Sequence, residues 1–399
     1  MKRRIAIILI FISMASLLTG CWSKRELNEL SIATAIGIDK SGDKYTVSVQ
    51  LMNPSEIAGQ KSSGQRAASV VYKAEGKSIF EALRRMTLST SRRIYVSHVR
   101  VIIFGEQVSR EGIKDLLDFL SRDHEMRSNV YMLTAKNSRA EDVLSILSVV
   151  EKIAANKIYL SLRSSEQSWA ATSVVKLDEL IDSISSKGRD AVMNGVLVKG
   201  NLEIGSTNEN IKNSQPPAIL AIDNIGVFKK DKLIGWLSEK EGIGYNQIMG
   251  KIKSTVVTVN SPEGGNVGIE IKNSKSSVKG KVENGKPKIY IDFKASGNVG
   301  DVQSTVDVTK AENIRKLEAE TEKNMEKNMK EVIERAQKEF QSDIFGFGEA
   351  IRRSNPKEWK KIEKNWNNGF KDLPVDINTT VTIKQIGTTT KPIPGEIKE

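Results

Sequence analysis

Apolar and polar residues follow a β-strand period near the start of the chain. Residues 32–39 form a mainly apolar run, and the segment 45–51 alternates between apolar and polar positions. The turn-forming residues 41–43 separate them. A period of two is typical of half-buried strands, so the pattern predicts a β-hairpin here.

Further along, the pattern switches repeatedly between strand and helix periods. Strands are expected at 70–74, 94–104 and 130–134. Helices are expected at 79–86, 108–120, 140–147 and 177–184. Alternating strands and helices predict a βαβαβ-like core.

After residue 190 the composition becomes β-rich. Short strands are expected at 194–204, 218–222, 225–229, 233–237 and 254–259. The Pro-Glu-Gly-Gly sequence at 262–265 breaks this series. We interpret it as a domain boundary.

The last third of the chain predicts an antiparallel meander, a long helix and a final strand. Meander strands are expected at 267–271, 277–282 and 288–295. Apolar residues from Ile314 to Phe340 then step by three or four, apart from one gap at Thr321. That spacing predicts one helix of about thirty residues, roughly 45 Å long. The final strand is expected at 375–386.

These elements predict a mixed α/β, or α+β, fold of three domains. The expected parts are an N-terminal βαβαβ-like domain at 21–190, a small β-rich middle domain at 191–260, and a C-terminal antiparallel sheet packed on the long helix at 261–399. A signal peptide is expected at 1–20.

The signal-peptide prediction comes from the N-terminal apolar run. Three basic residues precede the run 5–18, and Leu18-Thr19-Gly20-Cys21 follows directly. Fourteen helical residues span about 21 Å, less than the roughly 30 Å of a bilayer core, so an export signal fits better than a membrane span. Leu-x-Gly-Cys resembles a bacterial lipobox, which implies lipidation of Cys21 and an extracytoplasmic lipoprotein. The alternative is an ordinary buried thiol.

Charge and cysteine content narrow the possible partners. The formal net charge is +12 and the isoelectric point is near 9.4. Such a chain is attracted to anionic lipid headgroups or to nucleic acid. We expect no nucleic-acid partner, because the chain contains no helix-turn-helix, zinc-finger or RNA-binding motif. Cys21 is the only cysteine, so no disulfide supports the fold.

The search for catalytic chemistry finds no complete motif. His98 and His124 are the only histidines, and His124-Glu125 lacks the second histidine of a metalloprotease helix. No zinc site, serine elbow, phosphate loop or dinucleotide fingerprint is complete, so no catalytic, metal or cofactor residues are expected. His98 is interpreted as a core histidine.

One charge cluster leaves a choice open. Residues 122–127 contain Arg122, Asp123, His124, Glu125 and Arg127, and three further arginines could join them: Arg92, Arg93 and Arg100. The cluster is either an ion-pair network or an acid/base site, and we favour the structural interpretation.

Four groups of residues together resemble a known family. They are CWSKRELNEL at 21–30 with AIGID at 35–39, SHVR at 97–100 with IFGE at 103–106, FLSRD at 119–123 with Glu125 and Arg127, and GVF at 226–228 with LIGWL at 233–237. In this order they resemble the Ger(x)C lipoproteins, the C subunits of nutrient germinant receptors in endospore-forming bacteria. The resemblance covers most of the chain.

The resemblance implies a role in a receptor and no enzymatic reaction. It implies anchoring through acylated Cys21 on the outer surface of the cell membrane or the inner spore membrane. It also implies work with A-type and B-type membrane-spanning subunits during germination in response to small nutrients.

Two other functions remain open from the sequence. A solute-binding lipoprotein would capture the nutrient directly, although the two halves of the chain show no internal duplication. An envelope hydrolase would use the cluster at 122–127.

Overall fold

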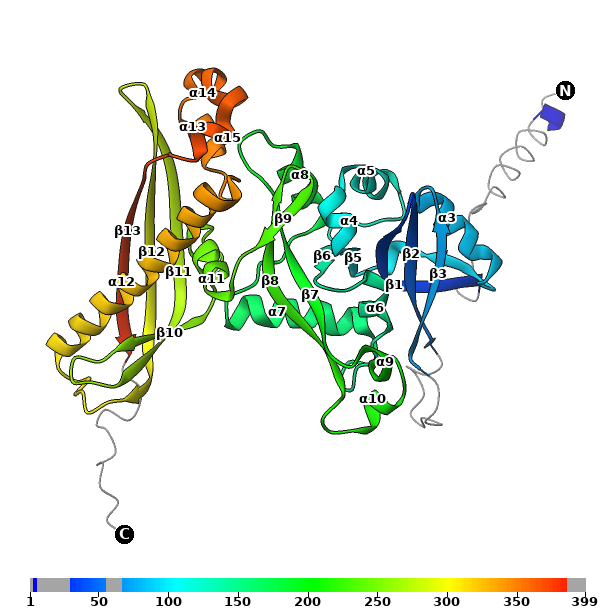
Figure 1. Cartoon of the computed structure of the whole chain (residues 1–399), viewed down its shortest axis with the longest axis horizontal. Helices are drawn as coiled ribbons and strands as arrows, with labels where there is room; N and C mark the ends of the chain where they lie inside the picture. The colour runs from blue at the N-terminus through cyan, green and yellow to red at the C-terminus, as the bar shows by residue number, and fades with distance from the viewer. Residues whose placement is uncertain (1–2, 6–28, 55–66, 386–399) are drawn as a thin grey trace, which may run out of the picture.

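The computed structural model describes residues 3–5, 29–54 and 67–385, which form two β-sheets arranged along one long axis (Figure 1). The first sheet, drawn in blue to green, lies at the end of the molecule that carries the N-terminal half. The second sheet, yellow to red, lies at the other end.

The first sheet has nine strands, in the order β3-β2-β1-β5-β6-β7-β8-β9, with β4 also paired to β1. The strands are β1 (Leu30–Ser41), β2 (Lys44–Met52), β3 (Ser69–Gly76), β4 (Arg93–Tyr95), β5 (Val101–Gly105), β6 (Tyr131–Ala135), β7 (Val192–Gly200), β8 (Ala218–Lys229) and β9 (Lys232–Trp236). Strands β1, β5, β6 and β7 are parallel, and antiparallel pairs flank them. The expected βαβαβ-like core is therefore present.

Helices cover both faces of this sheet. One face carries α3 (Ile79–Arg85), α5 (Lys114–Arg122) and α8 (Leu177–Ser185), and the opposite face carries α6 (Ala140–Ser145) and α7 (Ala154–Ser168). Helix α4 (Glu106–Glu111) and the short helices α9 (Leu202–Gly205) and α10 (Glu209–Lys212) complete this part. The apolar faces of the two helix layers contribute to separate hydrophobic clusters, so the sheet is buried on both sides.

Two elements expected as continuous are interrupted. The expected strand 94–104 is divided by a 3₁₀ turn at Val96–His98, so β4 pairs with the start of β1 and β5 with its later part. The expected helix 108–120 is divided at Gly112, whose φ of 131° is outside the helical range.

The second sheet has the order β10-β11-β12-β13. Its strands are β10 (Thr255–Asn260), β11 (Asn266–Glu283), β12 (Lys286–Gln303) and β13 (Val375–Gln385). Strands β10, β11 and β12 pair antiparallel, whereas β13 runs parallel to β12. The strands expected separately at 267–271 and 277–282 are parts of one strand, β11, and β10 takes the outer place in the antiparallel series. The parallel pair is possible because a long helical crossover separates these two strands in the chain.

The expected long helix packs on this sheet. Helix α12 (Ala311–Arg335) continues into a π-helical turn at Ala336–Phe340. Its Met325 and Met329 side chains are fully buried, as expected for core residues. Three shorter helices follow: α13 (Phe347–Ser354), α14 (Pro356–Ile362) and α15 (Trp366–Phe370).

Two observations concern the expected domain limits. Strands β7 to β9, which supply the expected middle domain, continue the first sheet. Strand β10 precedes the expected boundary at residue 261, yet it pairs with β11 of the second sheet. The chain thus changes from one sheet to the other between β9 and β10, through α11 (Glu239–Ile248).

In the parts of the chain that the structure describes, no helix has both the length and the apolar character needed to cross a membrane.

Candidate functional site

Residues from the motifs that carried the family resemblance meet beyond the carboxyl ends of the parallel strands. Asp39, at the end of β1, is buried and accepts hydrogen bonds from the Ala140 and Glu141 nitrogens at 2.8 and 3.0 Å. It thereby supplies the first turn of α6 with acceptors. A Cβ on Gly105 would lie 2.3 Å from Asp39 Oδ1, so this close approach requires glycine. Burial raises the pKa of Asp39, although the two N–H donors oppose that rise.

Glu106 links the next strand end to the edge of the sheet. Its carboxylate accepts hydrogen bonds from the Asn137 nitrogen at 2.7 Å and from Arg110 at 2.6 Å. The Trp236 indole nitrogen lies 3.5 Å from the same carboxylate. Three of the four motif groups are therefore joined by contacts that organise the sheet.

The charge cluster at 122–127 does not form one site. Arg93 pairs with Glu125 at 2.6 Å, so one of the three candidate arginines joins it. Arg122 pairs with Asp118 of its own helix, and Arg100 stacks 5.2 Å from the Tyr159 ring. These separate partners fit the structural interpretation. The expectation for His98 was wrong, because its side chain is exposed at the end of the 3₁₀ turn, where it contacts the Tyr95 ring edge-on.

Cys21, the predicted lipidation site, lies outside the described residues. Its chemistry remains a prediction from sequence.

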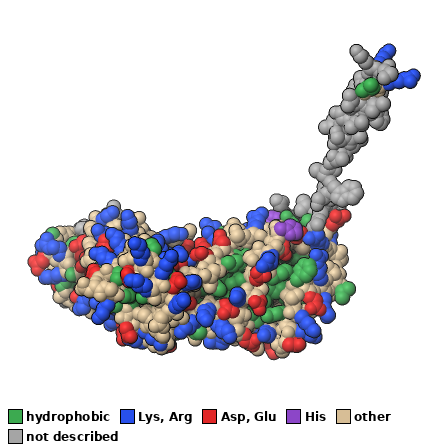
Figure 2. Space-filling view, turned by 90° about the horizontal axis from the view of Figure 1, so that it is seen from above, with side chains coloured by type: hydrophobic (Ala, Val, Ile, Leu, Met, Phe, Trp, Pro, Cys, Tyr) green, Lys and Arg blue, Asp and Glu red, His purple; other side chains and the backbone are tan. Residues whose placement is uncertain are grey.

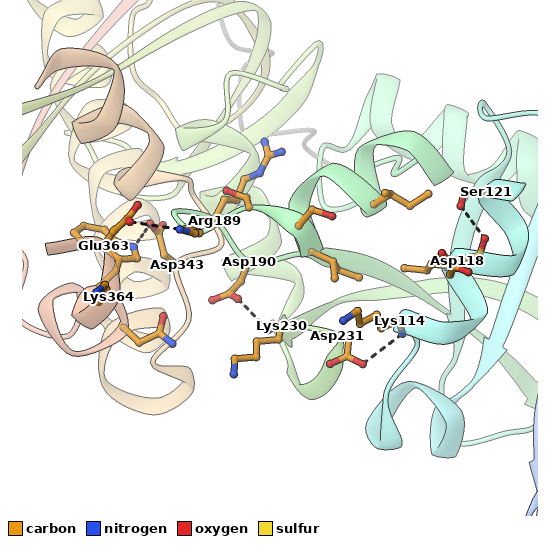
Figure 3. Close-up of a pocket in the computed structure, with 18 residues that line it drawn as sticks. Lys114, Asp118, Ser121, Arg189, Asp190, Lys230, Asp231, Asp343, Glu363 and Lys364 are labelled. Carbon is orange, nitrogen blue, oxygen red and sulfur yellow. Dashed lines mark hydrogen bonds and ion pairs between the residues drawn. The ribbon is translucent and has the colours of Figure 1, made fainter. Parts of the chain in front are cut away.

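The structure adds a site that the sequence did not predict. A pocket of about 700 Å³ lies between the first sheet's helices and the helices that follow α12 (Figure 3). Leu117 of α5, Ile181 and Ile184 of α8, and Trp366 of α15 contribute apolar surface. The charged lining residues are Lys114, Asp118, Lys187, Arg189, Asp190, Lys230, Asp231, Asp343, Glu363 and Lys364.

A buried polar joint forms the floor of this pocket. The Asp190 nitrogen donates to the Asp343 carbonyl oxygen at 2.7 Å. Ser342 Oγ lies 2.9 Å from both Asp190 Oδ2 and the Phe228 carbonyl oxygen, and it can donate to either. The backbone nitrogen of Lys230 donates a hydrogen bond to Asp190 Oδ1 at 3.0 Å. Asp190 therefore connects the two ends of the molecule.

Asp343 is the most perturbed acid of the joint. One carboxylate oxygen accepts from the Phe347 nitrogen at 3.0 Å, and the other from the Gly348 nitrogen at 2.8 Å and the Trp366 indole at 3.0 Å. Burial nevertheless raises the pKa of Asp343 to about 7, and the negative charge of Asp190 adds to the rise.

The charged residues that line the pocket are evenly divided between five acids and five bases. Glu363 pairs with Lys187 at 3.4 Å across the pocket, and Asp118 pairs with Arg122. The exposed ammonium groups of Lys114, Lys230 and Lys364 form no ion pair with any described residue. The pocket therefore presents these three ammonium groups beside the carboxylates of Asp190 and Asp231.

The described residues that line the pocket include no serine–histidine pair. Neither histidine is among the described residues that line it. The hydroxyl of Ser186 donates to Glu349 at 2.8 Å, and that of Ser121 to the Asp118 carbonyl oxygen at 2.8 Å. Among the described residues, no group of three or more His, Cys, Asp or Glu side chains could hold a metal ion. The interactions that these lining residues form are those of binding and of connecting the two sheets.

Two family models match the chain in sequence order. The model described as "Spore germination protein N-terminal domain" matches residues 23–197. The model described as "Spore germination B3/ GerAC like, C-terminal" matches residues 223–387. Together they cover most of both sheets.

Characterised proteins of similar length also match. Spore germination protein KC of Bacillus subtilis (strain 168) is 28% identical over 407 residues, covering 100% of each chain. Spore germination protein B3 of the same organism is 26% identical, covering 94% of this chain and 96% of the relative. Spore germination protein A3, also from that organism, is 23% identical, covering 93% of this chain and 95% of the relative.

A solved structure shares the fold. The crystal structure of the GerBC protein is 22% identical, with a TM-score of 0.53, covering 87% of this chain and 96% of that chain. This likeness supports the mixed α+β architecture with its two sheets.

Proposed function

This chain belongs to the Ger(x)C family of spore germination proteins, and on that basis we propose that it is the lipid-anchored C subunit of a nutrient germinant receptor. The match of both family models, in order, along residues 23–197 and 223–387 is the observation that supports this proposal most strongly. The role is binding and signalling through contact, without catalysis.

The proposed anchor is a lipidated Cys21. Its support is the sequence Leu18-Thr19-Gly20-Cys21 after a short apolar run with a basic start. A diacylglyceryl group would bring two acyl chains, and two chains are needed for stable membrane attachment. The protein would then lie on the outer surface of the cell membrane or of the inner spore membrane.

The proposed partners are the A-type and B-type membrane-spanning subunits of the receptor. The family resemblance supports them, and contact with them would transmit the response to amino acids or sugars. No step of this role requires a cofactor or nucleic acid.

Germination of spores that lack this gene tests the role. We expect loss of the response to one class of nutrient, with a normal response to a non-nutrient trigger that bypasses receptors. The same deletion is made in a strain that already lacks every other receptor of this type. If that strain responds to nutrients equally well with and without this gene, the proposal is contradicted.

Cys21→Ala tests the anchor separately. We expect the protein to leave the membrane fraction and the nutrient response to weaken. Cys21→Ala spores with wild-type membrane content of the protein and wild-type germination would rule out lipid anchoring. Immunoblots of total protein control for loss of expression.

Direct capture of the nutrient is a second candidate, favoured by the pocket of about 700 Å³. This volume is within the range of small-molecule sites, about 300–1,000 Å³. Calorimetry of the detergent-solubilised full chain with amino acids and sugars tests it. Micromolar binding that Lys230→Gln and Lys364→Gln together abolish would support this function, and no heat with any nutrient would exclude it.

A further inference from the structure

An exposed surface with arginine and apolar side chains lies on α3 and the loop that follows it. We call it the arginine face, and its residues are Phe80, Arg84, Arg85, Leu88, Arg92 and Arg93. The Leu88 side chain is 90% exposed and that of Phe80 is 52% exposed. Large apolar side chains at such exposure, surrounded by cations, are typical of surfaces that bind a partner.

The charge of this surface is mostly positive. Residues 80–93 contain four arginines and one acid, Glu81. Arg85 pairs with Glu81 at 3.0 Å, and Arg93 pairs with Glu125 at 2.6 Å. The Arg84 guanidinium lies 5.0 Å from the centre of the Phe80 ring, and Arg92 forms no ion pair with any described residue. Figure 2 shows Lys and Arg, histidine and hydrophobic side chains near one another toward the end of the molecule that carries the first sheet.

The register of the first sheet places this surface beside the start of β1. Leu30 is the Cα partner of Arg93 in the parallel pair of β1 and β4. Cys21 precedes Leu30 by nine residues. Nine residues reach at most about 30 Å when fully extended, so Leu30, beside Arg93, lies no farther than this from a membrane anchored at Cys21.

We propose that the arginine face lies on the anionic surface of the membrane that holds the anchor, with Leu88 and Phe80 entering the headgroup region. This inference rests on the anchoring part of the proposed function. The planar guanidinium group of arginine can donate two hydrogen bonds to the oxygens of one phosphate group. Each cation near an anionic membrane surface raises the affinity of the protein for that membrane roughly fivefold. The anchor fixes one point, and the arginine face fixes the orientation.

The position of the Leu88 side chain in the lipidated full-length protein tests this. Once Cys21 is lipidated its thiol no longer reacts, so Leu88→Cys can carry a single environment-sensitive fluorophore. The probe is a vesicle of phosphatidylcholine, with and without phosphatidylglycerol. We expect the label at 88 to be protected from an aqueous quencher several-fold on the anionic vesicles and much less on the neutral ones.

Val150→Cys is the matched control for the label. Val150 is 85% exposed and lies between α6 and α7, which cover the opposite face of the sheet. Its label should remain accessible to the quencher on both kinds of vesicle. Equal quenching of the two labels on floating vesicles would overturn the orientation while leaving the anchor intact.

Charge variants test the attraction. Arg84→Gln with Arg92→Gln should abolish the protection of the label at 88, whereas Lys152→Gln with Lys157→Gln, an equal charge change on the other face, should not. Equal effects of both pairs would overturn the role of the arginine face.

Two further outcomes would also overturn the inference. Protection that requires reconstituted membrane-spanning subunits would assign the face to a protein partner. Failure of the lipid-modified protein to float at all would contradict the anchor and, with it, this orientation.

Discussion

At the scale of single residues, Asp343 is the group on which the joint depends most. It accepts three N–H donors, from Phe347, Gly348 and Trp366, and it is buried. A buried acid whose two oxygens both accept hydrogen bonds holds neighbouring segments in one arrangement. Its protonation therefore links the stability of the joint to pH.

Asp343→Asn should remove a pH dependence of stability. The pKa of Asp343 is raised to about 7 in the folded state from an ordinary value of 3.8, so between about pH 4 and pH 7 the folded state holds a proton that the unfolded state releases. The free energy of unfolding of the wild type should therefore fall as pH rises through this window, by up to about 4 kcal/mol, and level off above it.

Urea unfolding of the wild type and the variant across this pH range measures the effect. The variant should lack this part of the fall, and Asp115→Asn, at an exposed position on α5, should retain it. If the free energy of unfolding changed equally with pH in the wild type and in Asp343→Asn, the raised pKa of Asp343 would not be the cause of the pH dependence.

At the scale of elements, α12 protects the free edge of the second sheet. Strand β13 is an edge strand, and its Val381 and Ile383 nitrogens donate to Glu322 and Glu318 of α12, at 2.9 and 2.8 Å. Unpaired edge N–H groups are templates for pairing with another chain. The helix thus stabilises the sheet and also covers hydrogen-bond donors that would otherwise be free.

Glu318→Ala with Glu322→Ala should expose this edge. We expect a loss of roughly 1–3 kcal/mol in the free energy of unfolding and concentration-dependent self-association. Chemical unfolding and sedimentation velocity measure the two effects. Glu320→Ala is the control, since that side chain pairs with Lys323 at 3.9 Å, and a control that associates equally would refute the role of the edge.

Helices and strands with a strong hydrophobic periodicity could be predicted from the sequence. Elements whose residues are chosen for close contact with other parts of the fold could not. The hairpin of β1 and β2, the parallel core and the long helix follow from periodicity. Helix α11 was missed because Gly242 and Gly244 are typical of loops. A Cβ at these positions would lie 2.5 Å from the Ala171 carbonyl oxygen and 2.4 Å from that of Asn328, so tertiary contact requires glycine within this helix.

The pocket escaped prediction for a related reason. Asp190, Lys230 and Asp343 are far apart in sequence, and no motif links them. They come together because Ser342 and Asp343, in the segment between α12 and α13, form hydrogen bonds with Asp190 at the start of β7. The family motifs, by contrast, were visible in sequence, and their residues prove to organise strand ends.

At the scale of the whole molecule, the two sheets share one continuous hydrophobic core. The same cluster contains Ile36 of β1 and Phe293 of β12. Arg335 of α12 pairs with Glu241 of α11 at 2.6 Å, and a Cβ on Gly188 would lie 2.7 Å from the Glu349 nitrogen. The two ends of the molecule should therefore unfold together.

Gly188→Ala should make the two ends of the molecule unfold in separate transitions. The added methyl group meets backbone atoms that cannot move cheaply, which costs about 1–3 kcal/mol. Calorimetry should show one transition for the wild type and two for the variant. Gly300→Ala, whose Cβ would have no atom nearer than 3.7 Å, should keep one transition, and a split in both variants would contradict the role of Gly188.

The position of β1 has a mechanical consequence. The first strand of the sheet in chain order is an inner one, paired with β2 on one side and with β4 and β5 on the other. Any tension from the proposed anchor would enter the protein along this strand. The hydrogen bonds on both sides of β1 run across the strand, and so across the direction of such a pull. The pull would therefore load these bonds in shear and all at once, and it would not open them one after another. A chain anchored as proposed would thus remain folded under tension applied at this strand.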